Sequence, residues 1–207
     1  MGLLPVFPGF LLDEFYEIPV EKKSPVVNCD EFKEKNGYVA VFINNNGLAL
    51  TKDQHAAIFL GRETDADHLL YDPSGTYAKG RGYQISDPNH RIEPRGGAIF
   101  NKGEFSYHDY YLFHRADGPN VNVFAFNLTK CEQEEIRQRI IENISGSEDY
   151  AQCTLLVRKV LHGIGPFKNL GKPITPSGLS PEVRKLTKLP TKHDEKSVLK
   201  RMRGVQE

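Results

Sequence analysis

Three residues in the sequence, Cys153, His55 and Asp72, have the side chains that together can carry out acyl transfer. The thiolate of cysteine is its nucleophilic form, and a cysteine in the first turn of a helix lies where the backbone dipoles favour that form. Such a nucleophile needs a base, usually histidine, and a group that orients the second imidazole nitrogen. The three residues meet these requirements if the fold brings them together.

Cys153 lies in a segment, DYAQCTLLVRKVLHGIG, whose apolar residues recur with helical spacing. We predict a helix over 150–162, with Asp149 as its N-cap and Gly163 as a stop signal. The alternative for a lone cysteine before such a run is a small buried core residue, which is the commoner role. As a nucleophile Cys153 is favoured over Cys131, because the acidic residues after Cys131 would raise the pKa of its thiol.

The three cysteines, Cys29, Cys131 and Cys153, are odd in number and widely spaced. The chain is too long for a disulfide-stabilised miniprotein, and no CxxC pair indicates a zinc site or a redox motif. We therefore expect all three to be free thiols.

His55 and Asp72 lie at the outer ends of two strand-like segments, AAIFL at 56–60 and HLLYD at 68–72. A hairpin closed by residues 61–66 would place His55 directly opposite Asp72. Opposed residues of an antiparallel pair have Cβ atoms about 4.5–5.5 Å apart, so the carboxylate could hold the imidazole, and a slip of one residue would separate them. In the alternative interpretation His55 caps a strand and Asp72 opens an Asp-Pro-Ser-Gly turn.

The remaining pattern predicts an antiparallel sheet followed by helices. We expect strands at 38–43, 47–51, 106–114 and 121–128, a structured loop over 73–105 with a short strand at 98–100, and a helix over 130–144. Thr129 and Glu132 have the spacing of a capping box at the start of that helix. Residues 184–203 hold eight basic residues against two acidic ones, which predicts a solvated basic helix or a disordered arm.

The composition is that of an ordinary globular protein, with 207 residues, 39% of them hydrophobic, and a formal net charge of zero. General binding to nucleic acid or to a membrane surface needs a concentrated positive field, which a neutral chain supplies only locally. The segment MGLLPVFPGFLLDEF lacks the features of a signal peptide, and no segment reaches the about 18–20 apolar residues of a transmembrane helix. We expect synthesis in the cytoplasm and export only through a dedicated machine.

We expect neither a metal nor a cofactor. His108 and His114 share the parity of one predicted strand, but six residues place them roughly 20 Å apart, too far to bind one ion. The histidines for which the sequence indicates only surface or structural roles are His68, His90, His162 and His193. No glycine pair precedes a helix, so a phosphate-binding loop is not indicated.

The segment HAAIFLG at His55, the segment LLYDPSG at Asp72 and the segment YAQCTLLV around Cys153 resemble papain-fold cysteine hydrolases. In papain itself the cysteine comes first, whereas the order in this chain is similar to the circularly permuted members of the NlpC-type superfamily. The resemblance covers roughly residues 38–165. It implies an α+β fold in which an antiparallel sheet packs against the nucleophile helix. The regions expected on this basis are an N-terminal extension at 1–37, a catalytic domain at 38–180 and a basic tail at 181–207.

The resemblance implies that Cys153 attacks a carbonyl, that His55 accepts and returns the proton, and that Asp72 orients the imidazole. The backbone N–H of Cys153 would stabilise the oxyanion, with the side chain of Gln152 as a weaker candidate. Many permuted members have asparagine where this chain has Gln152, and the segment 73–105 is longer than the minimal fold needs. Both differences bear on the oxyanion partner and the substrate class.

Among permuted papain-like proteins of this size, the resemblance favours a bacterial amidase or peptidase that cuts the peptides of peptidoglycan. Without an export signal it resembles effectors that the type VI secretion machine delivers into the periplasm of a rival cell, which implies an immunity protein as partner. The alternative is a cysteine protease, deamidase or acyltransferase acting on a protein or lipid inside a target cell. A second alternative is an inactive papain-like binding module that acts through tail residues Lys196, Lys200, Arg201 and Arg203.

Overall fold

The computed structural model describes residues 29, 33–46, 54–73, 77, 98–142, 152–187, 196, 199–200 and 203. Its strands are β1 (Gly37–Asn45), β2 (Gln54–Leu60), β3 (Leu69–Asp72), β4 (Ala98–Asn101) and β5 (Val121–Leu128). Its helices are α2 (Tyr107–Arg115), α3 (Lys130–Glu142), α4 (Gln152–Leu161) and α5 (Pro176–Leu186), with a 3₁₀ turn, η2, at Gly165–Phe167. The strands form one antiparallel sheet in the order β4-β3-β2-β1-β5, so the described part of the chain has an α+β fold.

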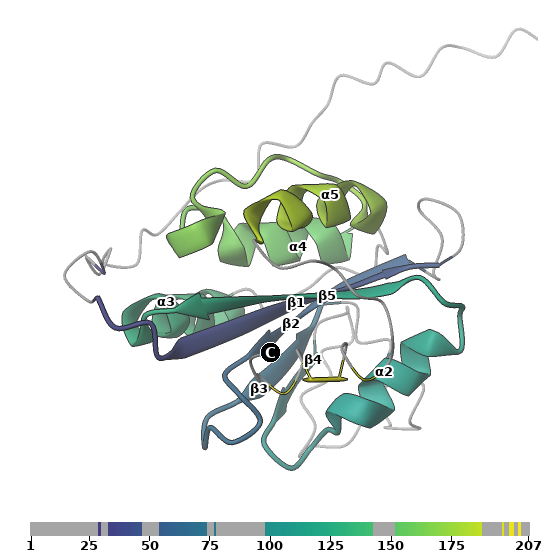
Figure 1. Ribbon diagram of the computed structural model, residues 1–207, viewed down its shortest axis with the longest axis horizontal. Coiled ribbons are helices and arrows are strands. Elements are labelled where there is room, and N and C mark those ends of the chain that lie inside the picture. Colours follow the sequence, from purple (N-terminus) through teal and green to yellow (C-terminus); the bar gives the residue numbers. More distant parts are fainter. Residues whose placement is uncertain are drawn as a thin grey trace, which may run out of the picture.

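Both faces of the sheet are covered. Helices α3, α4 and α5 pack on one face, and α2 lies on the other (Figure 1). In β1, Val39 and Val41 face the first set of helices, whereas Ala40 and Phe42 face α2. Successive strand side chains point to opposite faces, so a strand buried on both sides is apolar at every position. This explains the continuous apolar segment at 38–43.

The two faces enclose different cores. On the side of α3, α4 and α5 lies a mainly aliphatic core, which includes Val39, Val41, Ile43, Ile58, Leu60, Leu69, Ile136, Ile140, Val157, Val160, Leu161 and Val183. On the side of α2 lies an aromatic core, which includes Tyr38, Phe42, Phe59, Tyr77, Phe100, Tyr107, Tyr110 and Tyr111.

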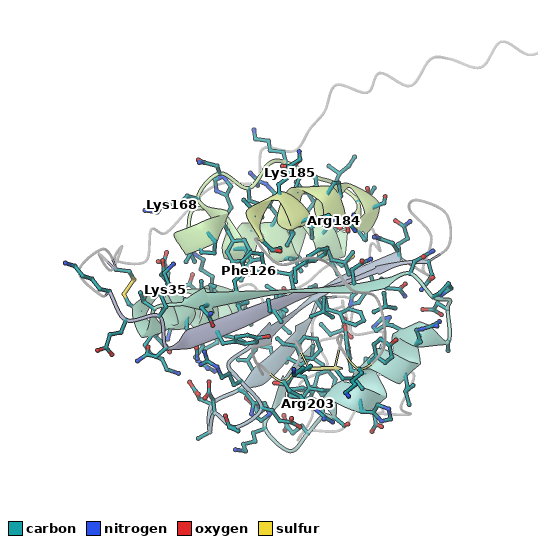
Figure 2. All side chains as sticks on the ribbon, in the orientation of Figure 1. Lys35, Phe126, Lys168, Arg184, Lys185 and Arg203 are labelled. Atoms are coloured by element: carbon teal, nitrogen blue, oxygen red, sulfur yellow. A yellow bond between two sulfur atoms is a disulfide. The ribbon has the colours of Figure 1, made fainter. Side chains whose placement is uncertain are left out.

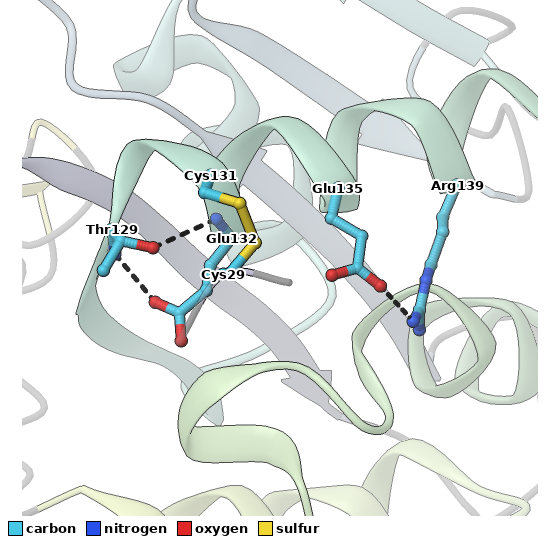
Figure 3. Close-up of a disulfide and its surroundings, with 6 residues drawn as sticks. All are labelled: Cys29, Thr129, Cys131, Glu132, Glu135 and Arg139. Atoms are coloured by element: carbon cyan, nitrogen blue, oxygen red, sulfur yellow. Dashed lines mark hydrogen bonds and ion pairs between the residues drawn. A yellow bond between two sulfur atoms is a disulfide. The ribbon is translucent and has the colours of Figure 1, made fainter. Parts of the chain in front are cut away.

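The capping box at the start of α3 is confirmed. The N–H of Thr129 donates to Oε2 of Glu132 at 2.7 Å, and the N–H of Glu132 donates to Oγ1 of Thr129 at 3.1 Å (Figure 3). Two N-terminal donors that have no partner inside the helix are thereby satisfied. The helices predicted at 130–144 and 150–162 are both found, as are the strands at 98–100 and 121–128.

The strand predicted at 106–114 is wrong, because this segment forms α2. Its buried residues are Tyr107, Tyr110, Tyr111 and His114, which is helical spacing, and the Oγ of Ser106 accepts from the N–H of Asp109 as an N-cap. The aromatic residues favoured a strand by intrinsic preference, and burial of one helix face overrides that preference.

The expectation of three free thiols is also wrong. Cys29 and Cys131 form a disulfide with Cα atoms 5.5 Å apart (Figure 3), and Cys153 is the free cysteine. The two bridged cysteines are 102 positions apart in the sequence, so only the tertiary fold brings them together. The bridge ties the segment before β1 to the first turn of α3.

Helix α5 corrects the predicted domain boundary at residue 180. The Oγ1 of Thr175 accepts from the N–H of Gly178, and Pro176 occupies the first turn, where no intrahelical N–H bond is lost. Val183 is fully buried in the aliphatic core. The packed domain therefore extends to Leu186.

The C-terminal segment contacts the domain as well. Leu199 packs against the aromatic core, and Nε of Arg203 lies 3.2 Å from Oε2 of Glu63. Figure 2 shows Arg203 on the α2 side of the sheet, whereas Lys185 lies on the side of α5. The sequence predicts a solvated basic helix or a disordered arm over 184–203, and the structure adds that Leu199 and Arg203 of this segment contact the domain.

Among the residues that the structure describes, no helix combines the length and the apolar character needed to cross a membrane. The strand predicted at 47–51, most of the loop predicted at 73–105 and the predicted N-cap Asp149 lie outside them.

Candidate functional site

His55 and Asp72 meet at one end of the sheet, where β2 begins and β3 ends. The Nε2 atom of His55 lies 2.8 Å from Oδ1 of Asp72, and both side chains are buried. Leu60 pairs with Leu69, so the predicted register of this hairpin is wrong by two residues. Because strand side chains alternate with a period of two, this shift leaves His55 and Asp72 on the same face as diagonal rather than directly opposed neighbours.

Cys153 approaches the same place from α4. It is the second residue of that helix, is 2% exposed and packs in the aliphatic core. Its side chain is hydrogen-bonded to that of His55, and the backbone N–H of Ala56 donates to its sulfur. Ala56 lies beyond the part of β2 that pairs with β3, so the strand backbone is open to the sulfur at this point.

The structure thus brings together the three residues proposed from the sequence. The Nε2 atom of His55 lies against Asp72, and the same ring is hydrogen-bonded to the thiol of Cys153. His55 and Asp72 face the side of the sheet on which α2 lies, whereas Cys153 belongs to a helix on the other side. They meet where β3 stops, because there the sheet no longer separates its two faces.

The three groups change one another's protonation. Burial disfavours charge on the His55 ring, but the charge of Asp72 and the hydrogen bonds to Asp72 and Cys153 outweigh it and raise the pKa of His55 to about 10. Burial also opposes ionisation of Cys153, but the hydrogen bond from His55, its positive charge and the Ala56 N–H lower the pKa of the thiol below its usual value. Both shifts favour a thiolate–imidazolium pair.

Asp72 is anchored as the anion of this group. Its Oδ2 accepts the backbone N–H of Tyr77 at 3.1 Å. Burial raises the pKa of the carboxyl group, but the charge of His55, the hydrogen bond from it and the Tyr77 N–H lower that pKa below its ordinary value. Asp72 is fully buried, so it can orient the imidazole without competition from water.

Sequence reasoning missed His114, which lies against His55. The two rings are stacked, with centroids 5.0 Å apart and planes 10° apart, and His114 is 2% exposed. The signal for this residue was the helical spacing of Tyr107, Tyr110, Tyr111 and His114, which was interpreted as a strand. A helical reading would have placed His114 on the buried face.

The other residues considered from the sequence lie as follows. Gln152 is the first residue of α4 and is partly exposed beside Cys153, and its role in an oxyanion hole stays a prediction. His68 is buried, and its Nδ1 lies 2.9 Å from the carbonyl oxygen of Asp65. His90 and His193 lie outside the described residues. The part of the chain that the structure describes contains no cluster of three His, Cys, Asp or Glu side chains that could hold a metal ion.

The arrangement contains the three kinds of group that nucleophilic acyl transfer by a cysteine needs. A thiolate at the start of a helix can attack a carbonyl, an adjacent imidazolium can protonate the leaving group, and a buried carboxylate can hold the imidazolium. In comparisons with known proteins, no family model, no curated protein and no solved structure matches this chain.

Proposed function

We propose that this protein is a cysteine hydrolase of the amidase or peptidase type, with a circularly permuted papain-like fold. Cys153 is the nucleophile, His55 is the acid–base residue and Asp72 orients the imidazole. The observation that carries this proposal is the contact of one buried imidazole with both a thiol and a carboxylate. A core cysteine of purely structural role needs neither partner.

The reaction follows from these contacts. The Cys153 thiolate attacks the carbonyl carbon of an amide, and the electrons move onto the oxygen to form a tetrahedral oxyanion. The His55 imidazolium gives its proton to the leaving nitrogen as the C–N bond breaks, which yields an acyl-enzyme and a free amine. A water molecule, deprotonated by His55, then attacks the thioester and releases the carboxylic acid and the thiol. We expect the backbone N–H of Cys153, in the first turn of α4, to donate to the oxyanion.

The substrate we propose is the peptide part of peptidoglycan, cut in the periplasm of a target cell. The resemblance of the segments around His55, Asp72 and Cys153 to permuted NlpC-type proteins supports this choice. The Cys29–Cys131 disulfide adds support, because disulfides persist in oxidising compartments such as the periplasm and are rare in the cytosol.

The test is mass spectrometry of the muropeptides released from purified sacculi by the wild-type protein. We expect new stem fragments from the wild type and none from Cys153→Ala, which removes only the sulfur. Leu155→Ala is the matched control, because Leu155 lies on the same helix and is 42% exposed. It should release the same fragments as the wild type.

Two results would contradict the proposal in different ways. Fragments released equally by Cys153→Ala would exclude a cysteine nucleophile. Empty profiles from all three proteins would exclude peptidoglycan and redirect the search to protein or lipid amides and esters. Toxicity on directed expression separates these cases, since a wall enzyme is toxic in the periplasm and an enzyme with a cytosolic target is toxic in the cytoplasm.

A further inference from the structure

A second buried imidazole, His114 of α2, covers one face of the His55 ring. The planes of the two rings are 10° apart and their centroids are 5.0 Å apart. Phe42, Tyr110 and Phe113 surround His114, with ring centroids 4.7–5.1 Å from it. The His55 ring therefore rests on a flat surface that is itself held by aromatic neighbours.

Hydrogen bonds determine which nitrogen of His114 carries the proton. The Oδ1 atom of Asn44 accepts from the backbone N–H of Asn46 at 3.0 Å, which fixes the orientation of the Asn44 amide. Its Nδ2 is then a donor that lies 3.4 Å from Nδ1 of His114 and 2.9 Å from Oδ2 of Asp117. Facing a donor, Nδ1 of His114 acts as an acceptor, so the neutral ring carries its proton on Nε2.

The surroundings of His114 keep the ring neutral. Among the described residues, the charged and titratable groups facing it are His55 from β2, Asp72 from β3, Tyr110 of α2 and Asp117 after α2. Burial and the charge of His55 lower the pKa of His114 to about 3, and Asp72 opposes this shift only in part. A neutral aromatic ring attracts the imidazolium of His55 stacked on it, whereas a second cation would repel it.

We propose that His114, held by Asn44, is a positioning residue that keeps the His55 ring between Asp72 and Cys153. This role deepens the proposed function and rests on it. In this role His114 acts through the His55 ring, on which it stacks. It fixes the plane of the His55 ring and favours the protonated ring over the neutral one, which in turn favours the Cys153 thiolate.

The experiment measures the thiolate directly by its ultraviolet absorbance as a function of pH. The two other cysteines are joined in a disulfide, so subtracting the spectrum of the same protein carrying Cys153→Ala isolates this one group. The variants are His114→Leu, which removes the flat ring, and His114→Phe, which keeps it. Arg115→Leu, at the exposed next position of α2, is the matched control.

We expect His114→Leu to raise the midpoint of thiolate formation by about one pH unit, which is a tenfold loss of the ion pair. Turnover should fall about tenfold in kcat, with KM unchanged, because binding of the substrate is not altered. His114→Phe and Arg115→Leu should keep both quantities within about threefold of the wild type. Near-ultraviolet circular dichroism checks that each variant is folded.

A second pair of variants keeps the test decisive if His114→Leu does not fold. In Asn44→Ala the donor to Nδ1 is lost, and Asp117, whose Oδ2 lies 3.9 Å from that nitrogen, can favour its protonation. Thiolate should then be lost at acidic pH through repulsion between the two rings. Adding His114→Phe to Asn44→Ala should restore it, which a merely structural role of Asn44 does not predict.

The results separate this inference from the proposed function. A thiolate midpoint that is the same in His114→Leu and in the wild type would overturn the positioning role, and so would an equal loss in His114→Phe and His114→Leu. If the variants rank as expected but no amide is hydrolysed, the positioning role stands and the assigned reaction fails.

Discussion

The two faces of the sheet differ in what they bury. The side of α3, α4 and α5 is packed mainly with valine, isoleucine and leucine side chains, and Cys153 is among its buried residues. The side of α2 is packed with tyrosine and phenylalanine, and beside these rings lie the buried polar groups of Asn44, His55, Asp72 and His114. The proposed nucleophile therefore lies on the aliphatic side of the sheet, and the groups proposed to control its proton lie on the aromatic side.

This difference shows how a small domain can build a charged site without losing its core. Aliphatic side chains have no polar atoms to satisfy, so they can hold the start of α4 rigidly beside β2. Buried imidazoles and carboxylates need hydrogen bonds and favourable ring contacts, which the aromatic side supplies. The site forms at the one end of β3 where the two sides meet.

The substitution with the largest expected effect changes a buried polar group on the aromatic side of the sheet. Asp72→Asn keeps the size of the side chain but removes the charge that holds the His55 imidazolium. By analogy with known catalytic triads, we expect kcat to fall about 10²–10⁴-fold. Steady-state hydrolysis of a peptidoglycan stem peptide, the proposed substrate, measures this.

The control for that experiment is Asp109→Asn, which removes an exposed carboxylate of α2 on the same side of the sheet. It should change kcat by less than about threefold, because Asp109 lies in the first turn of α2 and His114 in its last turn. Equal losses in the two variants would show that the charge of the whole side matters and not the contact of Asp72 with His55.

Particular residues show how far the sequence could predict this site. Side chains alternate between the two faces along a strand, so the sequence of β2 and β3 indicated that His55 and Asp72 share a face. That prediction needs only the two-residue period of a strand. The register could not be predicted, because the connection is longer than the six residues expected. It is shaped by Gly61, which has a φ of +82°, and by the bond from the Arg62 N–H to Asp65.

Other features were beyond sequence reasoning because they depend on tertiary contacts. His114 belongs to the site only because α2 packs across the start of β2, and its aromatic segment favours a strand when taken alone. The Cys29–Cys131 bridge depends on where α3 begins in space. In contrast, α3 and α4 were predictable because the apolar spacing of both helices and the capping box of α3 are local.

The next largest effect concerns the disulfide on the aliphatic side. The double substitution Cys29→Ser with Cys131→Ser opens a loop of about 100 residues, so the free energy of unfolding should fall by about 2–4 kcal/mol. Urea unfolding measures this. The kcat should be unchanged at temperatures where the variant is folded, because the bridge lies near Gly37 of β1 and the site near Asn44, roughly 20 Å along the strand. A lower kcat in the folded variant would contradict this separation.

A smaller effect is the change in the free energy of unfolding with pH, which has opposite directions for the two stacked imidazoles, His55 and His114. The pKa of His55 is raised, so its contribution to stability is complete below pH 6.5 and is lost as the pH rises towards about 10. The pKa of His114 is lowered to about 3, so its contribution is complete above pH 6.5 and is lost as the pH falls. Between pH 6.5 and 5 the wild type should lose about 2 kcal/mol of unfolding free energy relative to His114→Phe.

Urea unfolding at a series of pH values measures this difference between the wild type and His114→Phe. Above pH 7 the two curves should run parallel, which is the internal control, because His114 is then neutral in both the folded and the unfolded chain. An acid loss of the same size in His114→Phe would show that other groups cause it.

The smallest expected effects come from substitutions that remove one helix cap on each side of the sheet. Thr129→Ala removes the cap of α3 and Ser106→Ala removes the cap of α2, and each should lower the free energy of unfolding by about 1 kcal/mol. Their effects on turnover should differ. α2 carries His114 against His55, so fraying its first turns loosens the positioning of the imidazole and lowers kcat. α3 touches none of the three site residues through its cap, so Thr129→Ala should leave kcat unchanged. Equal kcat values in Thr129→Ala and Ser106→Ala at equal stability would mean that α2 has only a packing role. The groups that control the proton of Cys153 would then be His55 and Asp72 without His114.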